Sequence, residues 1–103
     1  MDHQVIWTDP AIDDLQAVVI AIAQDNSQRA RLVGDSILDH ADVLATFPRL
    51  GPIYEATGGQ PVRVIFCDPY QIFYRVFDDQ RSVEIMHVRH AVRQSPRFRP
   101  SST

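Results

Sequence analysis

The chain has 103 residues, of which 45% are hydrophobic and 22% are charged, so its size predicts one globular domain with a single core. No apolar run approaches the roughly 18 to 20 residues that a membrane-spanning helix needs. The first residues, MDHQVIW, lack the basic and apolar regions of a signal peptide. We therefore expect a cytoplasmic protein. The single cysteine, Cys67, has no partner for an internal disulfide.

The charge is divided unevenly along the chain. All ten basic residues are arginine. Residues 1–60 carry three arginines against nine acidic residues, a net charge of −6, and residues 61–103 carry seven arginines against four, a net charge of +3. Arginine binds phosphate and carboxylate well, although arginines on strands also simply solvate one face of a sheet.

The first half of the chain predicts a short strand and two helices. Residues 5–7 form the strand, and Thr8-Asp9-Pro10 is a helix-start signal because Thr8 or Asp9 can cap the first turn. Apolar residues then recur with helical spacing until about Gln24. The second helix is predicted over residues 28–47, where Pro48 stops it. The short connection predicts an antiparallel helical hairpin.

The second half predicts a loop over residues 49–61 and then three strands. The strands are PVRVIFC, YQIFYRVF and SVEIMHVRH, joined by Asp68-Pro69 and by residues 78–81. Alternation puts Arg63 with Ile65 and Cys67 on one side of the first strand. The last strand is apolar on both faces at its middle, which favours a central position.

These elements predict a two-layer α+β domain in the order β-α-α-β-β-β. The helical hairpin packs on one face of a small, mainly antiparallel sheet. We expect a single domain over residues 1–95 and a flexible C-terminal tail over residues 96–103.

Residues 84–93, EIMHVRHAVR, concentrate histidine and arginine at the end of the last strand. His87 and His90 are three residues apart, which on a strand points them to opposite faces. No cysteine or acidic pair flanks them, so we predict no metal site and no bound cofactor. His87 is expected to satisfy a local hydrogen bond, and Cys67 is interpreted as a small strand residue.

Metal-free cleavage of RNA is a second interpretation of the same residues. Such a reaction needs a base, an acid and cations for the phosphate, and histidine titrates near neutrality. Arg63, Arg75, Arg89 and His90 have this chemistry if the strands gather them on one face. Otherwise Arg63 and Arg75 pair with local carboxylates and His90 caps a strand end. With a negative net charge and no basic helix stripe, sequence-specific DNA binding by this chain alone is not expected.

Five segments occur in order along the chain: WTDPAIDDL, FPRLG, PVRVIF, YQIFYRVFDD and VEIMHVRH. In these segments the chain resembles the RelE/ParE superfamily of toxins. The resemblance spans residues 5 to about 95 and rests on order and spacing: Arg63 lies seven residues before Tyr70, Tyr74 precedes Arg75, and His90 ends the last strand. It implies the toxin half of a type II toxin–antitoxin pair, of the kind often described as plasmid stabilisation proteins. Its partner is then a cognate antitoxin, in a hetero-oligomer.

The superfamily divides by target. RelE-like members cleave messenger RNA on the ribosome without a metal, and ParE-like members poison DNA gyrase. RelE-like members are usually basic, with a catalytic tyrosine or lysine set near the end of the sheet. This chain has a pI near 5.7, no lysine and no tyrosine after Tyr74, and an acidic protein gains little affinity for RNA from counterion release. The ParE branch is therefore favoured. A ribosome-dependent endonuclease, an inactive relative that only binds its antitoxin, and an unrelated small α+β enzyme remain alternatives.

The candidate site residues follow from these interpretations. In a nuclease, the resemblance implies that Arg63, Arg75 and His90 are catalytic. In the favoured interpretation, Arg75, Arg89, His90 and Arg93 bind the target. The antitoxin is expected on the apolar surface of the helical hairpin and on a free edge of the sheet.

Overall fold

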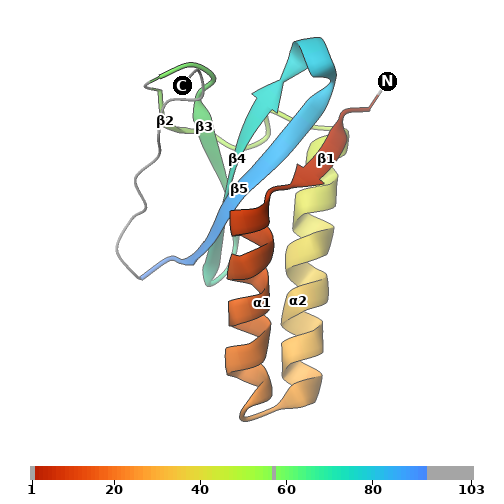
Figure 1. Ribbon diagram of the computed structural model, residues 1–103, viewed down its shortest axis with the longest axis vertical. Helices are drawn as coiled ribbons and strands as arrows, with labels where there is room; N and C mark the ends of the chain where they lie inside the picture. Colours follow the sequence, from red (N-terminus) through yellow and green to blue (C-terminus); the bar gives the residue numbers. More distant parts are fainter. Residues whose placement is uncertain (1, 57, 93–103) are drawn as a thin grey trace.

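The computed structural model describes residues 2–56 and 58–92 of the chain (Figure 1). Its helices are α1 (Asp9–Ala23) and α2 (Ser27–Asp42), with 3₁₀ turns η1 (Val43–Ala45) and η2 (Asp78–Gln80). Its strands are β1 (Gln4–Trp7), β2 (Ile53–Glu55), β3 (Val62–Cys67), β4 (Tyr70–Phe77) and β5 (Ser82–His90). None of the helices in these described ranges is long and apolar enough to cross a membrane.

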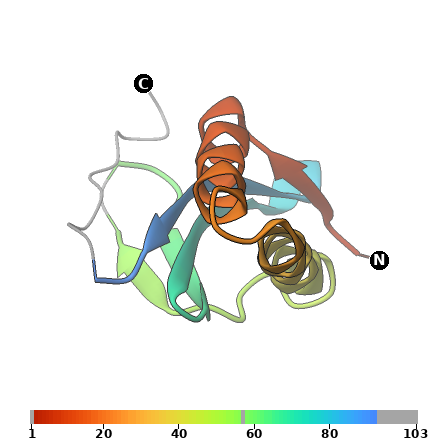
Figure 2. The ribbon, with the colours of Figure 1, turned by 90° about the horizontal axis from the view of Figure 1, so that it is seen from below.

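The five strands form one sheet in the order β1-β5-β4-β3-β2. β2, β3, β4 and β5 pair antiparallel, and β1 pairs parallel with β5. The last strand, β5, is therefore an inner strand with a neighbour on each side, as its apolar character predicted, although the middle strand of the sheet is β4. Both helices lie on the same side of the sheet (Figure 2). The predicted α+β fold, with a helical hairpin on a mainly antiparallel sheet, is confirmed.

The start of α1 ties the hairpin to β5. The Thr8 hydroxyl caps the helix by accepting from the backbone N–H of Ala11 at 3.4 Å and donates to the carbonyl of Ile85 at 2.7 Å. Asn26 caps α2 by accepting from the N–H of Arg29 at 3.0 Å. The predicted hairpin is present, but α2 ends at Asp42 and tightens into η1, so the predicted helix end near Phe47 was too late.

The loop predicted over residues 49–61 was also only partly right, because it contains the edge strand β2. This strand has three residues and pairs irregularly with β3. So short a strand between glycines and prolines lacks the alternation by which a longer strand is recognised.

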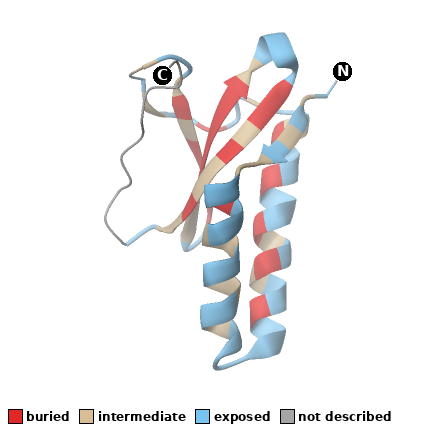
Figure 3. Cartoon of the chain, in the orientation of Figure 1, coloured by how far each residue is buried: buried red, intermediate tan, exposed pale blue. Residues whose placement is uncertain are grey.

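The core lies between the hairpin and the sheet. Buried residues of α2 and η1 face β3, β4 and β5 (Figure 3), and the fully buried set includes Ile37, Leu44, Ile72, Tyr74 and Ile85. A smaller cluster of Val62, Val64 and Phe73, with Tyr54 packed against it, lies on the opposite face of the sheet. The predicted C-terminal tail lies outside the described residues.

Candidate functional site

The strands do not gather the predicted nuclease residues on one face. Arg63 of β3 pairs with Tyr74 of β4, and Tyr74 belongs to the core beneath the helices. Arg75 follows Tyr74 and so points to the opposite face. His90 pairs with Tyr70, which is four residues from Tyr74 along β4, or roughly 13 Å at about 3.3 Å per residue.

Arg63 holds a turn in place. Its guanidinium Nη1 donates to the carbonyl of Gly51 at 2.8 Å, while the Gly51 N–H donates to the hydroxyl of Tyr74 at 2.9 Å. Burial raises the pKa of Tyr74 above its ordinary value of 10.0. The two side chains therefore clamp the backbone of Gly51 from both sides.

Arg75 is buried, with 4% of its surface exposed. Its Nε donates to the carbonyl of Gln60 at 3.1 Å, and it lies opposite Glu84 on β5. Burial lowers its pKa, which Glu55 and Glu84 partly counteract. A guanidinium held in this way is poorly placed to contact a large target.

Asp14 of α1 occupies the edge of β5 beyond the end of β1. The pairing with β1 stops at Ile85. Asp14 Oδ2 then accepts from the backbone N–H of Val88 and pairs with Nδ1 of His87, each at 3.0 Å. The same oxygen forms an ion pair with Arg89. His87 thus has the expected hydrogen bond, but its partner is distant in sequence.

The pKa of Asp14 is set by two opposing influences. Partial burial by itself raises this pKa, because it disfavours the charged form. The hydrogen bonds from Arg89, Val88 and His87, together with the charge of Arg89, outweigh that effect and lower the pKa below its ordinary value. Asp14 is therefore a carboxylate at neutral pH and fixes the direction of Arg89.

A bulge in β5 brings His90 against Tyr70. The register shifts between the Phe73–His87 and Tyr74–Ile85 pairs; without it Arg89 would lie opposite Tyr70. The rings of Tyr70 and His90 meet edge to face with centroids 5.5 Å apart. Tyr70 was not among the predicted site residues, because a catalytic tyrosine was sought only after Tyr74. Tyr70 lies earlier in the sequence, on β4, the strand that pairs with the end of β5.

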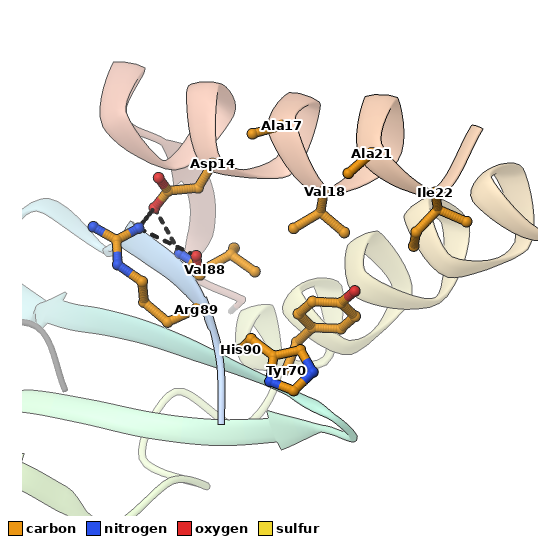
Figure 4. Close-up of a pocket in the computed structure, with 9 residues that line it drawn as sticks. All are labelled: Asp14, Ala17, Val18, Ala21, Ile22, Tyr70, Val88, Arg89 and His90. Atoms are coloured by element: carbon orange, nitrogen blue, oxygen red, sulfur yellow. Dashed lines mark hydrogen bonds and ion pairs between the residues drawn. The ribbon is translucent and has the colours of Figure 1, made fainter. Parts of the chain in front are cut away.

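These residues border a cleft of about 250 Å³ between α1 and the end of β5. We call it the α1/β5 cleft; its lining residues are Asp14, Ala17, Val18, Ala21, Ile22, Tyr70, Val88, Arg89 and His90. Figure 4 shows the α1 side chains along one side, the rings of Tyr70 and His90 on the other, and the Asp14–Arg89 pair at one end. Of the predicted target-binding residues, the structure therefore brings Arg89 and His90 together and places Arg75 elsewhere. Arg93 lies outside the described residues.

A second, larger groove of about 620 Å³ runs between α1 and α2. We call it the hairpin groove. Its walls include Leu15, Val19, Ile20 and Leu38, and Ala30 and Gly34 also line it. Ile20 is 61% exposed and Leu38 is 40% exposed. The two hollows share no lining residue, so α1 separates them.

Within residues 2–56 and 58–92, no three histidine, cysteine or acidic side chains lie together in a way that would hold a metal ion. Cys67 is buried in the core cluster, and its Sγ lies 3.4 Å from the hydroxyl of Ser36. This arrangement fits the interpretation of Cys67 as a small strand residue.

Comparison with known proteins points to one group. A family model described as the ParE toxin of the type II toxin–antitoxin system parDE matches residues 5–95. Toxin RelE2 of Caulobacter vibrioides is 37% identical over 90 residues, which make up 87% of this chain and 97% of that protein.

Solved structures share the fold at low sequence identity. A chain of the chromosomal ParDE system of P. aeruginosa superposes with a TM-score of 0.71 at 19% identity, covering 85% of this chain and 95% of that one. A chain of the RelE–RelB complex of Pyrococcus horikoshii gives a TM-score of 0.67 at 16% identity, covering 91% of this chain and all of the other. The P. aeruginosa structure is described as a toxin–antitoxin system.

Proposed function

Because the chain belongs to the RelE/ParE superfamily as the toxin of a type II toxin–antitoxin system, we propose that it acts in the manner of the ParE branch, by poisoning DNA gyrase in the cytoplasm. A cognate antitoxin is its partner. The fold is common to both branches of the superfamily, so the choice between them depends on the side chains.

The observation that carries the proposal is the dispersal of the nuclease candidates. Arg63 clamps Gly51, Arg75 is buried on the opposite face of the sheet, and His90 lies against Tyr70 at the far end of β4. General acid–base cleavage needs its groups within hydrogen-bond reach of one phosphodiester. The net charge of −3 is also unfavourable for docking on ribosomal RNA.

A ribosome-dependent endonuclease is the second candidate, and two observations favour it. The relative from Caulobacter vibrioides bears the name RelE2, and the Tyr70–His90 pair places a phenol beside an imidazole. Among the described residues that line the cleft, the arginine near this pair is Arg89, and Arg89 is already bound to Asp14.

The deciding experiment measures methionine incorporation within minutes of inducing the gene without its antitoxin. The ParE hypothesis expects translation to continue while gyrase–DNA cleavage complexes accumulate. An immediate collapse of incorporation would replace gyrase with the ribosome as the target. Normal growth with neither effect would identify an inactive relative that only binds its antitoxin.

For the antitoxin, we propose the hairpin groove as the docking surface. Exposed apolar side chains at Ile20 and Leu38 leave a wide hydrophobic channel, and Arg31 and Asp35 border it with opposite charges. Such a channel fits the apolar face of an amphipathic helix. Leu38→Asp should weaken antitoxin binding measured by calorimetry by at least about tenfold, whereas exposed Leu32→Asp, which lies outside the groove, should not.

A further inference from the structure

We propose that the α1/β5 cleft receives one apolar side chain from an extended peptide segment of the protein that the toxin attacks. This inference rests on the proposed function, since it assigns the docking point for that target. It concerns a different surface from the antitoxin groove, because the two hollows share no lining residue.

The size of the cleft fits a single side chain better than a whole small molecule. Its volume of about 250 Å³ lies below the roughly 300 to 1,000 Å³ of sites that enclose a whole small molecule. Ala17 and Ala21 are exposed and leave room beside Val18 and Ile22. Tyr70 closes the opposite side (Figure 4). An aliphatic or small aromatic side chain fits such a slot between a helix and a ring.

The charge of the lining disfavours a nucleic-acid strand. Among the described lining residues, Asp14 supplies the carboxylate and Arg89 the guanidinium, and they pair with each other. Grooves for single-stranded nucleic acid combine a surplus of positive charge with free aromatic faces for bases. Here the guanidinium of Arg89 is balanced by the carboxylate of Asp14. A neutral, apolar occupant is the complementary one.

Two hydrogen-bond donors at the edge of the cleft suit the backbone of an extended segment. His90 Nδ1 accepts from the N–H of Val92 at 3.3 Å, so the neutral ring carries its proton on Nε2. Within the described part of the chain, neither this N–H nor the Tyr70 hydroxyl has a partner. A peptide carbonyl beside the anchoring side chain can accept from either group.

The first test uses a model compound for that side chain. N-acetyl-leucine-N-methylamide is titrated into the full, isotope-labelled chain, and amide chemical shifts are followed by NMR. We expect saturable shifts at Ala17, Ala21 and His90, and an affinity about tenfold or more above that of N-acetyl-alanine-N-methylamide. Equal affinities, or shifts confined to the hairpin groove, would overturn the proposal.

A matched pair of variants supplies the control. Ala21→Leu fills the cleft from an exposed helix position, and Ala23→Leu adds the same side chain two residues further along α1, outside the lining. Ala21→Leu should abolish the shifts caused by the leucine compound, whereas Ala23→Leu should keep them. Antitoxin affinity should stay within about twofold of wild type for both variants.

The second test is toxicity on induction without antitoxin. Ala21→Leu should lose toxicity at wild-type protein levels while Ala23→Leu remains toxic. An Ala21→Leu chain as toxic as wild type would overturn the assignment of the cleft to the target. If the wild-type chain itself is harmless but binds the leucine compound, then the proposed function fails while the side-chain site stands.

Discussion

Asp14 covers the edge of β5 that lies beyond the end of β1, while the other edge of β5 pairs with β4. It bonds to the backbone of Val88, to His87 and to Arg89, so it replaces the neighbour that β5 loses where β1 ends. Its carboxylate also occupies the Val88 N–H, a donor that a foreign strand would need in order to add to that edge. This residue connects the folding of the sheet with the geometry of the α1/β5 cleft.

Replacing Asp14 by alanine should lower the free energy of unfolding by about 1–3 kcal/mol, because three donors lose a charged acceptor. Urea unfolding measures the change. Asp13→Ala, at an exposed neighbouring position, is the matched control and should shift stability by no more than about 0.5 kcal/mol. Equal effects at the two positions would mean that the Asp14 network contributes nothing.

The separation of Arg63 from Arg75 was predictable from the sequence. The two-residue connection Asp68-Pro69 pairs Cys67 with Tyr70 and, counting back, Arg63 with Tyr74. Alternation along β4 then places the two arginines on opposite faces of the sheet. The contact of Tyr70 with His90 was not predictable in this way. It depends on a β-bulge in β5, and the residue pattern of β5 does not indicate where a bulge occurs.

At the scale of elements, the connection between η1 and β3 is fixed by close backbone contact. A Cβ at Gly51 would lie 2.3 Å from the carbonyl oxygen of Val64, and the turn is further held by Arg63 and Tyr74. Such an approach requires glycine. The clamped turn also places β2, which follows it in the chain, at the edge of β3.

Gly51→Ala should therefore cost about 2–4 kcal/mol of unfolding free energy. Gly34→Ala is the comparison, because its Cβ would meet only Val19 Cγ2 at 3.2 Å and the helix gains about 1 kcal/mol of propensity. Its net effect should lie within about 1 kcal/mol of zero. Chemical denaturation of both variants decides, and a harmless Gly51→Ala would contradict the packing described.

The sequence predicted the hairpin and the three long strands because helical periodicity, caps and alternation are local signals. It did not predict the order of the strands. The parallel pairing of β1 with β5 joins residues almost 80 positions apart, and only the shared need to cover the core brings them together. The Thr8 hydroxyl also donates a hydrogen bond to the carbonyl of Ile85. No local sequence pattern predicts this contact.

At the scale of the whole molecule, acid should weaken the fold through two carboxylates. Hydrogen bonds from Arg49 and His3 lower the pKa of Asp78 from 3.8 to about 2, and the pKa of Asp14 is also lowered. A carboxylate whose pKa is lower in the folded state than in the unfolded state stabilises the fold at any pH above its unfolded-state pKa. That contribution is lost as pH falls through the folded-state pKa.

Thermal unfolding should therefore show a falling midpoint as pH drops from 3.8 toward about 2. Asp78→Asn should flatten part of this slope, because it removes one of the two groups. Asp79→Asn, outside the Arg49–His3 network, is the control. An unchanged slope in Asp78→Asn would show that the network does not contribute to acid sensitivity.

The toxin should be more stable with its antitoxin than alone. Binding at one hundred times the dissociation constant adds about 2.7 kcal/mol, which for a domain of this size raises the melting midpoint by about 10 °C or more. Covering the exposed apolar side chains of the hairpin groove should also raise solubility. Equal melting midpoints for the free chain and the complex would contradict this expectation.

The position of α1 between two hollows has an evolutionary consequence. One flank of the helix lines the hairpin groove and the other lines the α1/β5 cleft, with no residue in common. If each hollow serves the partner proposed for it, mutations on one flank can change which antitoxin neutralises the toxin without altering what the toxin attacks. Duplicated genes in one genome could then become insulated from each other's antitoxins while retaining a single target.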